Sequence, residues 1–264
     1  MALLTNEFCP PRKTGNGLVP RRGLAGGAFD LACFDVPTVT SGAEPPGSDV
    51  VSRDLAGRTG GFAAGTKIAT PLGLRRIDDL CIGDLVQTQF GGAQPVLWVG
   101  GGSQVTAGPS AQVHVAAGVL GAACDMLVHS QQLILFRDAA AELLFGEAEV
   151  LIAAQDLLGL PGVTQDRLPR ITRYFHLLLP QHDLVCAGGV VSESMLPDAV
   201  VLQRLPARAL ADLRGTVSDR QLRKLCLQPA ARRILMPHQA RVLLAMLHQG
   251  DMASRIEVLL GLVA

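Results

Sequence analysis

The stretch from Gly61 to Val86, GFAAGTKIATPLGLRRIDDLCIGDLV, constrains the fold more than any other part of the chain. An apolar run leads into residues 71–73, Pro-Leu-Gly, which combine the fixed φ of proline with the permissive glycine of a tight turn. We therefore expect a β-hairpin, followed by one helical turn on which Ile77 and Leu80 are three residues apart. Gly83 ends that turn, so the stretch predicts a hairpin, a helical turn and a third strand.

The pattern of short strands continues well beyond this stretch. Apolar segments alternate with glycine clusters at residues 91–92, 100–102 and 188–189, a spacing typical of all-β folds. Residues 126–136 form one of these apolar segments and are expected to be a single strand. The sequence therefore predicts a mainly β domain over residues 60–197.

The segments on either side of this domain have a different character. Residues 1–59 hold 14 glycines or prolines, and such a stretch buries too little apolar surface to offset its ordering entropy. We expect a flexible leader there. Residues 198–264 have helical periodicity, with a capping sequence at Ser218 and a helix start at Pro237. They are expected to form a small helical C-terminal region of three or four helices.

The charge distribution limits the classes of partner. The chain has 23 Lys and Arg and 23 Asp and Glu, so no net field attracts it to nucleic acid or to acidic lipid. Residues 60–197 hold 7 basic and 12 acidic residues, a net charge of −5, whereas residues 198–264 hold 10 and 5, a net charge of +5. We therefore expect the acidic β domain to contact the basic C-terminal region. A protein partner of unknown identity stays open.

Targeting, redox and cofactor signals are few. The N-terminus has no basic region followed by a sustained apolar core, and no run approaches the roughly 18 apolar residues of a spanning helix. We expect a chain that does not span a membrane and is cytoplasmic, or exported by a route that needs no signal peptide. The 6 cysteines include no Cys-x-x-Cys pair, which favours reduced, buried thiols over a zinc framework. No glycine loop that could cradle a phosphate precedes a helix, so no cofactor is expected.

Several blocks of the chain resemble one protein family. Within residues 65–86 the pattern is Gly-Thr-x-Ile-x-Thr-Pro-x-Gly, followed by Ile-x-x-Leu-x-x-Gly-Asp-x-Val. Later blocks fall in the family's order at residues 95–100, 144–151 and 174–185, followed by 193–194. The chain resembles the Hint domain, the self-processing module shared by Hedgehog C-terminal domains and inteins, and is most similar to its bacterial branch. This resemblance implies a horseshoe-shaped, all-β domain and autocatalytic peptide-bond cleavage.

The resemblance also assigns the catalytic positions. The family has a Cys or Ser directly before the apolar residue filled here by Phe62, and its side chain attacks the preceding carbonyl. This chain has Gly61 there, which has no attacking atom. A second block in the family carries a histidine that protonates the departing amide. In this chain His129 falls at the first polar place of that block, and Gln132 falls where the imidazole belongs.

The positions late in the chain have changed as well. The His-Asn pair that ends splicing inteins would fall at Ser192 and Glu193, so asparagine cyclisation is not expected. His182 matches the histidine of the late block and Asp183 follows it, as an orienting pair without a nucleophile. The resemblance therefore implies a catalytically degenerate Hint domain that acts as a binding or scaffold module.

Two alternatives would give the chain an activity. An active autoprocessing protein would need a non-standard nucleophile, but Thr59 and Thr66 do not directly follow the carbonyl to be cleaved. A hydrolase could instead pair Cys186 with His182, although strand geometry separates residues four apart by about 13 Å. Both alternatives are less favoured than the degenerate domain.

A metal-dependent hydrolase is the third alternative. Two groups of side chains carry the right atoms: His114, Cys124 and His129, and His176, His182 and Cys186. Neither spacing is a recognised zinc-binding form, so we expect no metal.

Overall fold

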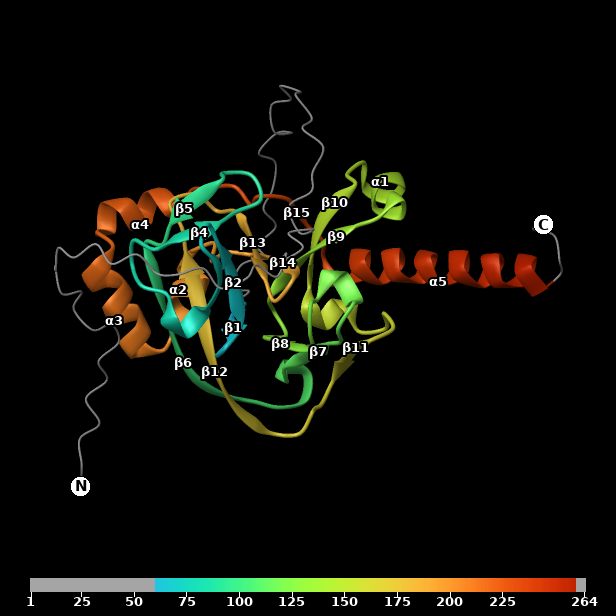
Figure 1. Ribbon diagram of the computed structural model, residues 1–264, viewed down its shortest axis with the longest axis horizontal. Helices are drawn as coiled ribbons and strands as arrows, with labels where there is room; N and C mark the ends of the chain where they lie inside the picture. The colour runs from blue at the N-terminus through green and yellow to red at the C-terminus, as the bar shows by residue number, and fades with distance from the viewer. Residues whose placement is uncertain (1–59, 260–264) are drawn as a thin grey trace, which may run out of the picture.

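The computed structural model of the chain describes residues 60–259, with side chains up to His248 (Figure 1). The expected flexible leader, residues 1–59, lies outside the described residues. Within them, residues 60–197 fold into two large β-sheets and one small sheet, which confirms the predicted mainly β domain. The small sheet pairs β4 (Leu85–Gln87) with β5 (Ala93–Pro95).

The first large sheet is antiparallel and has the strand order β11-β7-β8-β1-β12-β6. Its longest pairing joins β6 to β12 over nine residue pairs, from Thr106 opposite Arg170 to Trp98 opposite Leu178. The short β1 lies between β8 and β12, so the chain enters the domain in the middle of this sheet. The strands are β1 (Phe62–Ala63), β6 (Trp98–Thr106), β7 (Val113–Val115), β8 (Met126–Val128), β11 (Val163–Gln165) and β12 (Arg170–Leu178).

The second large sheet has the strand order β15-β10-β9-β14-β13-β2-β3. All its pairings are antiparallel except the one at the edge, where β15 runs parallel to β10. The strands are β2 (Lys67–Thr70), β3 (Gly73–Arg76), β9 (Leu133–Arg137), β10 (Glu149–Ala153), β13 (Leu184–Ala187), β14 (Val190–Glu193) and β15 (Arg233–Ile234).

Helices are short within the β domain and longer after it. The domain contains η2 (Ile77–Asp79), η3 (Gly108–Ser110), η4 (Val119–Gly121), α1 (Ala139–Phe145) and η5 (Ala154–Leu157). The C-terminal region contains α2 (Ala199–Arg204), α3 (Ala207–Thr216), α4 (Asp219–Leu225) and α5 (Pro237–Leu259).

The opening stretch folds as its sequence predicts. Strands β2 and β3 form the hairpin, and Gly73 has a φ of 107°, a conformation that glycine adopts at little cost. The helical turn is η2, which buries Ile77 completely, and β4 follows as the third strand. Ile77 joins a core cluster with Phe62, Ile68, Val86, Phe175 and Leu177, so this stretch packs directly on β12. Each fully buried side chain of this size contributes about 1.5–3 kcal/mol.

The prediction of one strand over residues 126–136 is wrong. The segment forms β8 and β9, which belong to different sheets, with residues 129–132 as the turn between them. The backbone N–H of Gln132 donates to the carbonyl of His129 at 2.9 Å, which closes this turn. The turn carries two of the catalytic positions that the resemblance assigns.

The C-terminal region follows the β domain across both sheets. Helices α2 to α4 cover the end where Trp98 is buried, and the indole Nε1 of Trp98 donates to Asp212 Oδ2 at 2.8 Å. The chain then adds β15 to the far edge of the second sheet, and α5 packs on α1 and η5 before it extends away from the body (Figure 1). The N-terminal cap at Ser218 is present, since its hydroxyl accepts from the N–H of Gln221.

The cysteines differ from the expectation of reduced, buried thiols. Cys124, Cys186 and Cys226 have free thiols, but only Cys186 is fully buried and Cys124 is exposed. Cys81 is disulfide-bonded, so the expectation is wrong at this position. Among the described residues, no helix is long and apolar enough to cross a membrane.

Candidate functional site

Gly61 lies between two histidines on neighbouring segments of the first sheet. Phe62 pairs with Phe175 on β12 and with Val128 on β8. Because both pairings are antiparallel, the preceding residue, Gly61, falls opposite His176 on one side and His129 on the other. The backbone N–H of His129 donates to the carbonyl of Gly61 at 3.2 Å, as this register requires.

His176 is the side chain that approaches position 61. A Cβ atom built on Gly61 would lie 3.4 Å from Cε1 of His176 and 3.2 Å from Cβ of Tyr174. The ring is buried, and this burial, together with the nearby His129, lowers the pKa of His176 to about 4, although a hydrogen bond with the backbone of Gly60 opposes the shift. His176 is therefore neutral at pH 7. Sequence reasoning considered it only as a metal ligand and missed this position.

Gln132 lies against the residue before position 61. A Cβ atom built on Gly60 would be 2.7 Å from Oε1 and 2.8 Å from Cα of Gln132, so only glycine fits here. The Nε2 of Gln132 donates to the carbonyls of Leu133 at 3.3 Å and Glu193 at 3.1 Å. Gln132 therefore borders the 60–61 bond, and its amide bridges β9 and β14.

His129 is buried close to the same bond but is directed at other groups. Its Nδ1 accepts from the N–H of Gln131 at 3.1 Å, and its ring packs edge-on against Tyr174 with centroids 4.9 Å apart. Burial lowers its pKa to about 4. The neutral ring stabilises the turn between β8 and β9.

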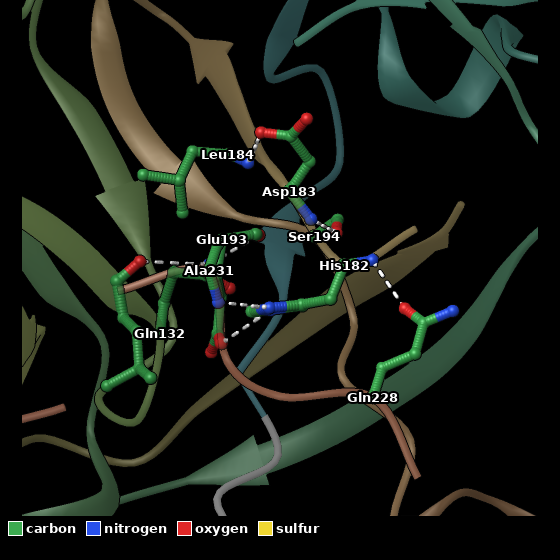
Figure 2. A network of polar contacts seen from close by, with 9 residues as sticks. Gln132, His182, Asp183, Leu184, Glu193, Ser194, Gln228 and Ala231 are labelled. Atoms are coloured by element: carbon green, nitrogen blue, oxygen red, sulfur yellow. Dashed lines mark hydrogen bonds and ion pairs between the residues drawn. The ribbon is translucent and has the colours of Figure 1, made fainter. Parts of the chain in front are cut away.

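His182 joins the β domain to the C-terminal region (Figure 2). The ring Nδ1 of His182 accepts from the backbone N–H of Ala231 at 3.0 Å. The backbone N–H of His182 donates to Oε1 of Gln228 at 2.7 Å. The other ring nitrogen, Nε2, lies 3.5 Å from Oε2 of Glu193. The imidazole is 1% exposed, and among the described residues its Nε2 has no hydrogen-bond partner.

Asp183 has a different set of partners. Its carboxylate accepts from the backbone N–H groups of Phe90, Gly91 and Leu184 and from Nε2 of Gln94, at distances of 2.7–3.2 Å. The side chain is buried, and its two oxygens tie the turn between β4 and β5 to β13. The resemblance treats His182 and Asp183 as one orienting pair. In the structure His182 holds the C-terminal region, whereas Asp183 holds the β4–β5 turn.

Three of these positions, Gly61, Gln132 and His176, line one small cavity. It has a volume of about 50 Å³, and its lining includes Gly60, Gly61, Gln132, His176, Glu193 and Ser194. Gln132 and His182 both contact Glu193, through its carbonyl and its carboxylate respectively. Gly61, Gln132 and His182 therefore gather around β14 (Val190–Glu193), whereas the carboxylate of Asp183 is directed to the β4–β5 turn.

The alternative sites do not assemble. In the part of the chain that the structure describes, no three metal-ligating side chains gather, so neither histidine and cysteine group forms a metal site. The ring of His182 is bound by Ala231 and Glu193 rather than by Cys186. The hydroxyl of Thr66 donates to the carbonyl of Ala63 at 2.7 Å, and Thr59 lies outside the described residues.

Comparison with known proteins identifies a family. A family model described as Hint domain matches residues 60–199. Among solved structures, a splice-inactive variant of the AceL NrdHF class 3 split intein is 15% identical, with a TM-score of 0.34 over 51% of this chain and 96% of that one. The bacterial intein-like domain from Clostridium thermocellum is 14% identical, with a TM-score of 0.35 over 51% and 98% of the two chains. No curated protein matches this chain.

Proposed function

The chain belongs to the Hint domain family, and we propose that its Hint domain has lost self-cleavage and serves as a binding or scaffold module. The observation that carries this proposal is the glycine at position 61. The acyl shift of the family begins with a thiol or hydroxyl on the residue that follows the scissile carbonyl. Gly61 has no side chain, so the Gly60 carbonyl has no neighbouring nucleophile and the 60–61 peptide bond stays intact.

The substitution at position 132 supports the same proposal. In the family, a histidine at this position gives a proton to the departing amide nitrogen, and a carboxamide does not act as an acid at neutral pH. Gln132 instead uses its Nε2 to bridge two backbone carbonyls, at Leu133 and Glu193. Its side chain therefore contributes to holding β9 against β14.

The remaining family positions have structural partners. His182 holds Ala231 and Asp183 holds the turn at Phe90 and Gly91. Each buried hydrogen bond to a charged or backbone group contributes about 1–3 kcal/mol, so these residues stabilise the module even without chemistry. An active protein with a non-standard nucleophile gains no support from Ser194, which lines the cavity and accepts from the N–H of Asp183 at 3.1 Å, because this residue does not directly follow the Gly60 carbonyl.

We further propose that opposite charges help to attach the C-terminal region to the Hint domain. Arg232 donates from Nε to Oε2 of Glu149 at 2.8 Å, and its guanidinium lies 3.7 Å from the ring centroid of Phe90. Glu149 also pairs with Arg137 at 2.7 Å. The acidic domain thus offers a carboxylate at the point where the basic region crosses it.

The proposed loss of activity is tested by incubating the purified full chain with dithiothreitol or hydroxylamine. Both reagents trap a thioester or an ester formed at the 60–61 bond, so an active protein would release a fragment that begins at Gly61. We expect intact-mass measurement to show a single uncut chain with dithiothreitol, with hydroxylamine and with neither reagent. A fragment that ends at Gly60 would contradict the proposal and favour the autoprocessing alternative.

A further inference from the structure

The imidazole of His176 lies beside the peptide unit that a nucleophile at position 61 would attack. The register places His176 opposite position 61, a Cβ atom at position 61 would lie 3.4 Å from its Cε1, and both residues line the same cavity. The backbone of Gly60 also favours the protonated ring, as a neighbouring carbonyl oxygen does. The ring is therefore within reach of the oxygen of Gly60.

Such a contact activates a carbonyl for addition. When a nucleophile adds to a peptide carbonyl, negative charge develops on the oxygen, and a fixed donor in a buried site stabilises it. His176 is 5% exposed and carries no positive charge at pH 7, so it is a preorganised neutral donor. Gln132 does not compete for this oxygen, because its Nε2 is bound to Leu133 and Glu193.

We propose that His176 is a retained catalytic residue that polarises the Gly60 carbonyl, and that a thiol at position 61 is the one group missing for thioester formation. The inference rests on the proposed loss of the nucleophile at Gly61. It differs from that proposal in assigning the surviving chemistry to His176 and in making an imidazole at position 132 unnecessary.

The step restored by Gly61→Cys can be written in full. The Sγ of residue 61 adds to the carbonyl carbon of Gly60, and the oxygen takes the charge while it accepts from His176. The C–N bond to residue 61 then breaks, the thiol proton passes to the released amine, and a thioester of Gly60 remains. Dithiothreitol exchanges with this thioester and separates residues 1–60 from residues 61–264.

An added thiol needs a small adjustment of the site. The nearest atoms to a Cβ at position 61 lie at 3.2–3.4 Å, so Tyr174 and His176 must shift by a few tenths of an ångström. The side chain of a cysteine there begins beside the ring of His176. Position 60 must stay glycine, because a Cβ there would overlap the backbone of Gln132.

The experiment measures cleavage of the full chain by dithiothreitol in four variants: Gly61→Cys alone, and Gly61→Cys combined with His176→Phe, His176→Gln or Gln132→His. We expect Gly61→Cys alone to be cut at the 60–61 bond. His176→Phe should slow this cutting about 100-fold, the usual effect of removing one donor to a developing oxyanion. His176→Gln keeps an N–H donor and should slow the cutting less than His176→Phe does. Ala64→Cys, a thiol on the same segment, serves as the uncut control.

Each outcome decides the inference. Cleavage that requires Gln132→His, cleavage unaffected by His176→Phe, or no cleavage in any variant would overturn it and leave the proposed loss of activity intact. If thermal melting shows that His176→Phe unfolds the protein, the His176→Gln variant decides. A folded His176→Gln variant that is cut about 100-fold more slowly would mean that an N–H donor at position 176 does not promote cleavage, and would overturn the inference. Cleavage of the unaltered chain would instead contradict the proposed function.

Discussion

The backbone N–H of Ala231 donates to Nδ1 of His182 at 3.0 Å in a partly buried contact (Figure 2). A histidine at a late-block position of the family thus holds the chain segment that leads into β15. Sequence comparison alone treats this residue as a remnant of catalysis. The contact gives His182 a structural role that does not depend on catalysis.

Replacing His182 should therefore destabilise the fold. His182→Phe keeps most of the volume but leaves the N–H of Ala231 without its acceptor, which costs about 1–3 kcal/mol. We expect a lower midpoint in chemical denaturation. His114→Ala, at a partly exposed ring with 36% of its side-chain surface accessible, is the control and should change stability by less than about 0.5 kcal/mol. Equal stability of the His182 variant and the unaltered chain would contradict the role of this contact.

The close approach of Gly60 to Gln132 makes a second prediction. Gly60→Ala introduces a methyl group 2.8 Å from Cα of Gln132, and overpacking of this kind costs about 1–3 kcal/mol. Gly215→Ala is the matched control, since its Cβ in α3 would meet no atom within 4 Å and alanine favours a helix. In thermal unfolding, the melting temperature should fall in Gly60→Ala and rise in Gly215→Ala. Similar melting temperatures would mean that the 60–132 contact is loose.

Stability should depend on pH through the two buried histidines. His129 and His176 have pKa values lowered to about 4, mainly by burial, from an ordinary 6.5. Between these values the unfolded chain binds protons that the folded chain does not, so stability is complete above about pH 6.5 and falls as pH drops toward 4. Each histidine contributes up to about 1.4 kcal/mol per pH unit in this window.

Denaturation curves at pH 7.0, 6.0 and 5.0 measure this effect. In His129→Phe, where one of the two groups is removed, the fall in stability across the same range should be roughly half as steep. An unaltered slope in that variant would show that His129 does not stay neutral in the folded protein.

The Arg232 contacts predict a salt effect. Arg232→Gln removes the ion pair with Glu149 and the contact with the Phe90 ring, which together contribute about 0.5–1.5 kcal/mol at a partly exposed site. The loss measured by urea denaturation should be smaller in 1 M NaCl than in low salt, because salt screens the pair. Arg208→Gln, on the exposed surface of α3, should show no such dependence. A loss that is the same at both salt concentrations would argue against charge attraction.

Local features of the fold could be predicted from the sequence because they depend on residues close together. The β2–β3 hairpin follows from a proline and a glycine two positions apart, and η2 follows from the spacing of Ile77 and Leu80. The same holds for the cap at Ser218. In each case, turn chemistry or helical spacing determines the conformation without help from distant segments.

Features that depend on distant residues could not be predicted in the same way. The apolar segment 126–136 gives no local sign that β8 and β9 enter different sheets, because the break depends on what each half packs against. The two residues of β15 have little strand signal, and their pairing with β10 depends on tertiary contact. The closeness of His176 to position 61 follows only from the register of β1 on β12. Of the candidate site, the resemblance supplied Gly61, Gln132, His182 and Glu193, but it gave no role to His176.

The central claim is that the 60–61 peptide bond is intact in the mature protein. Trypsin cuts after Arg58 and Lys67, so an uncut chain yields one peptide of residues 59–67 that spans this bond. Mass spectrometry of the protein digested after treatment with dithiothreitol should detect that peptide in full yield. Detection of residues 61–67 in its place would show that the chain cleaves itself and would contradict the account.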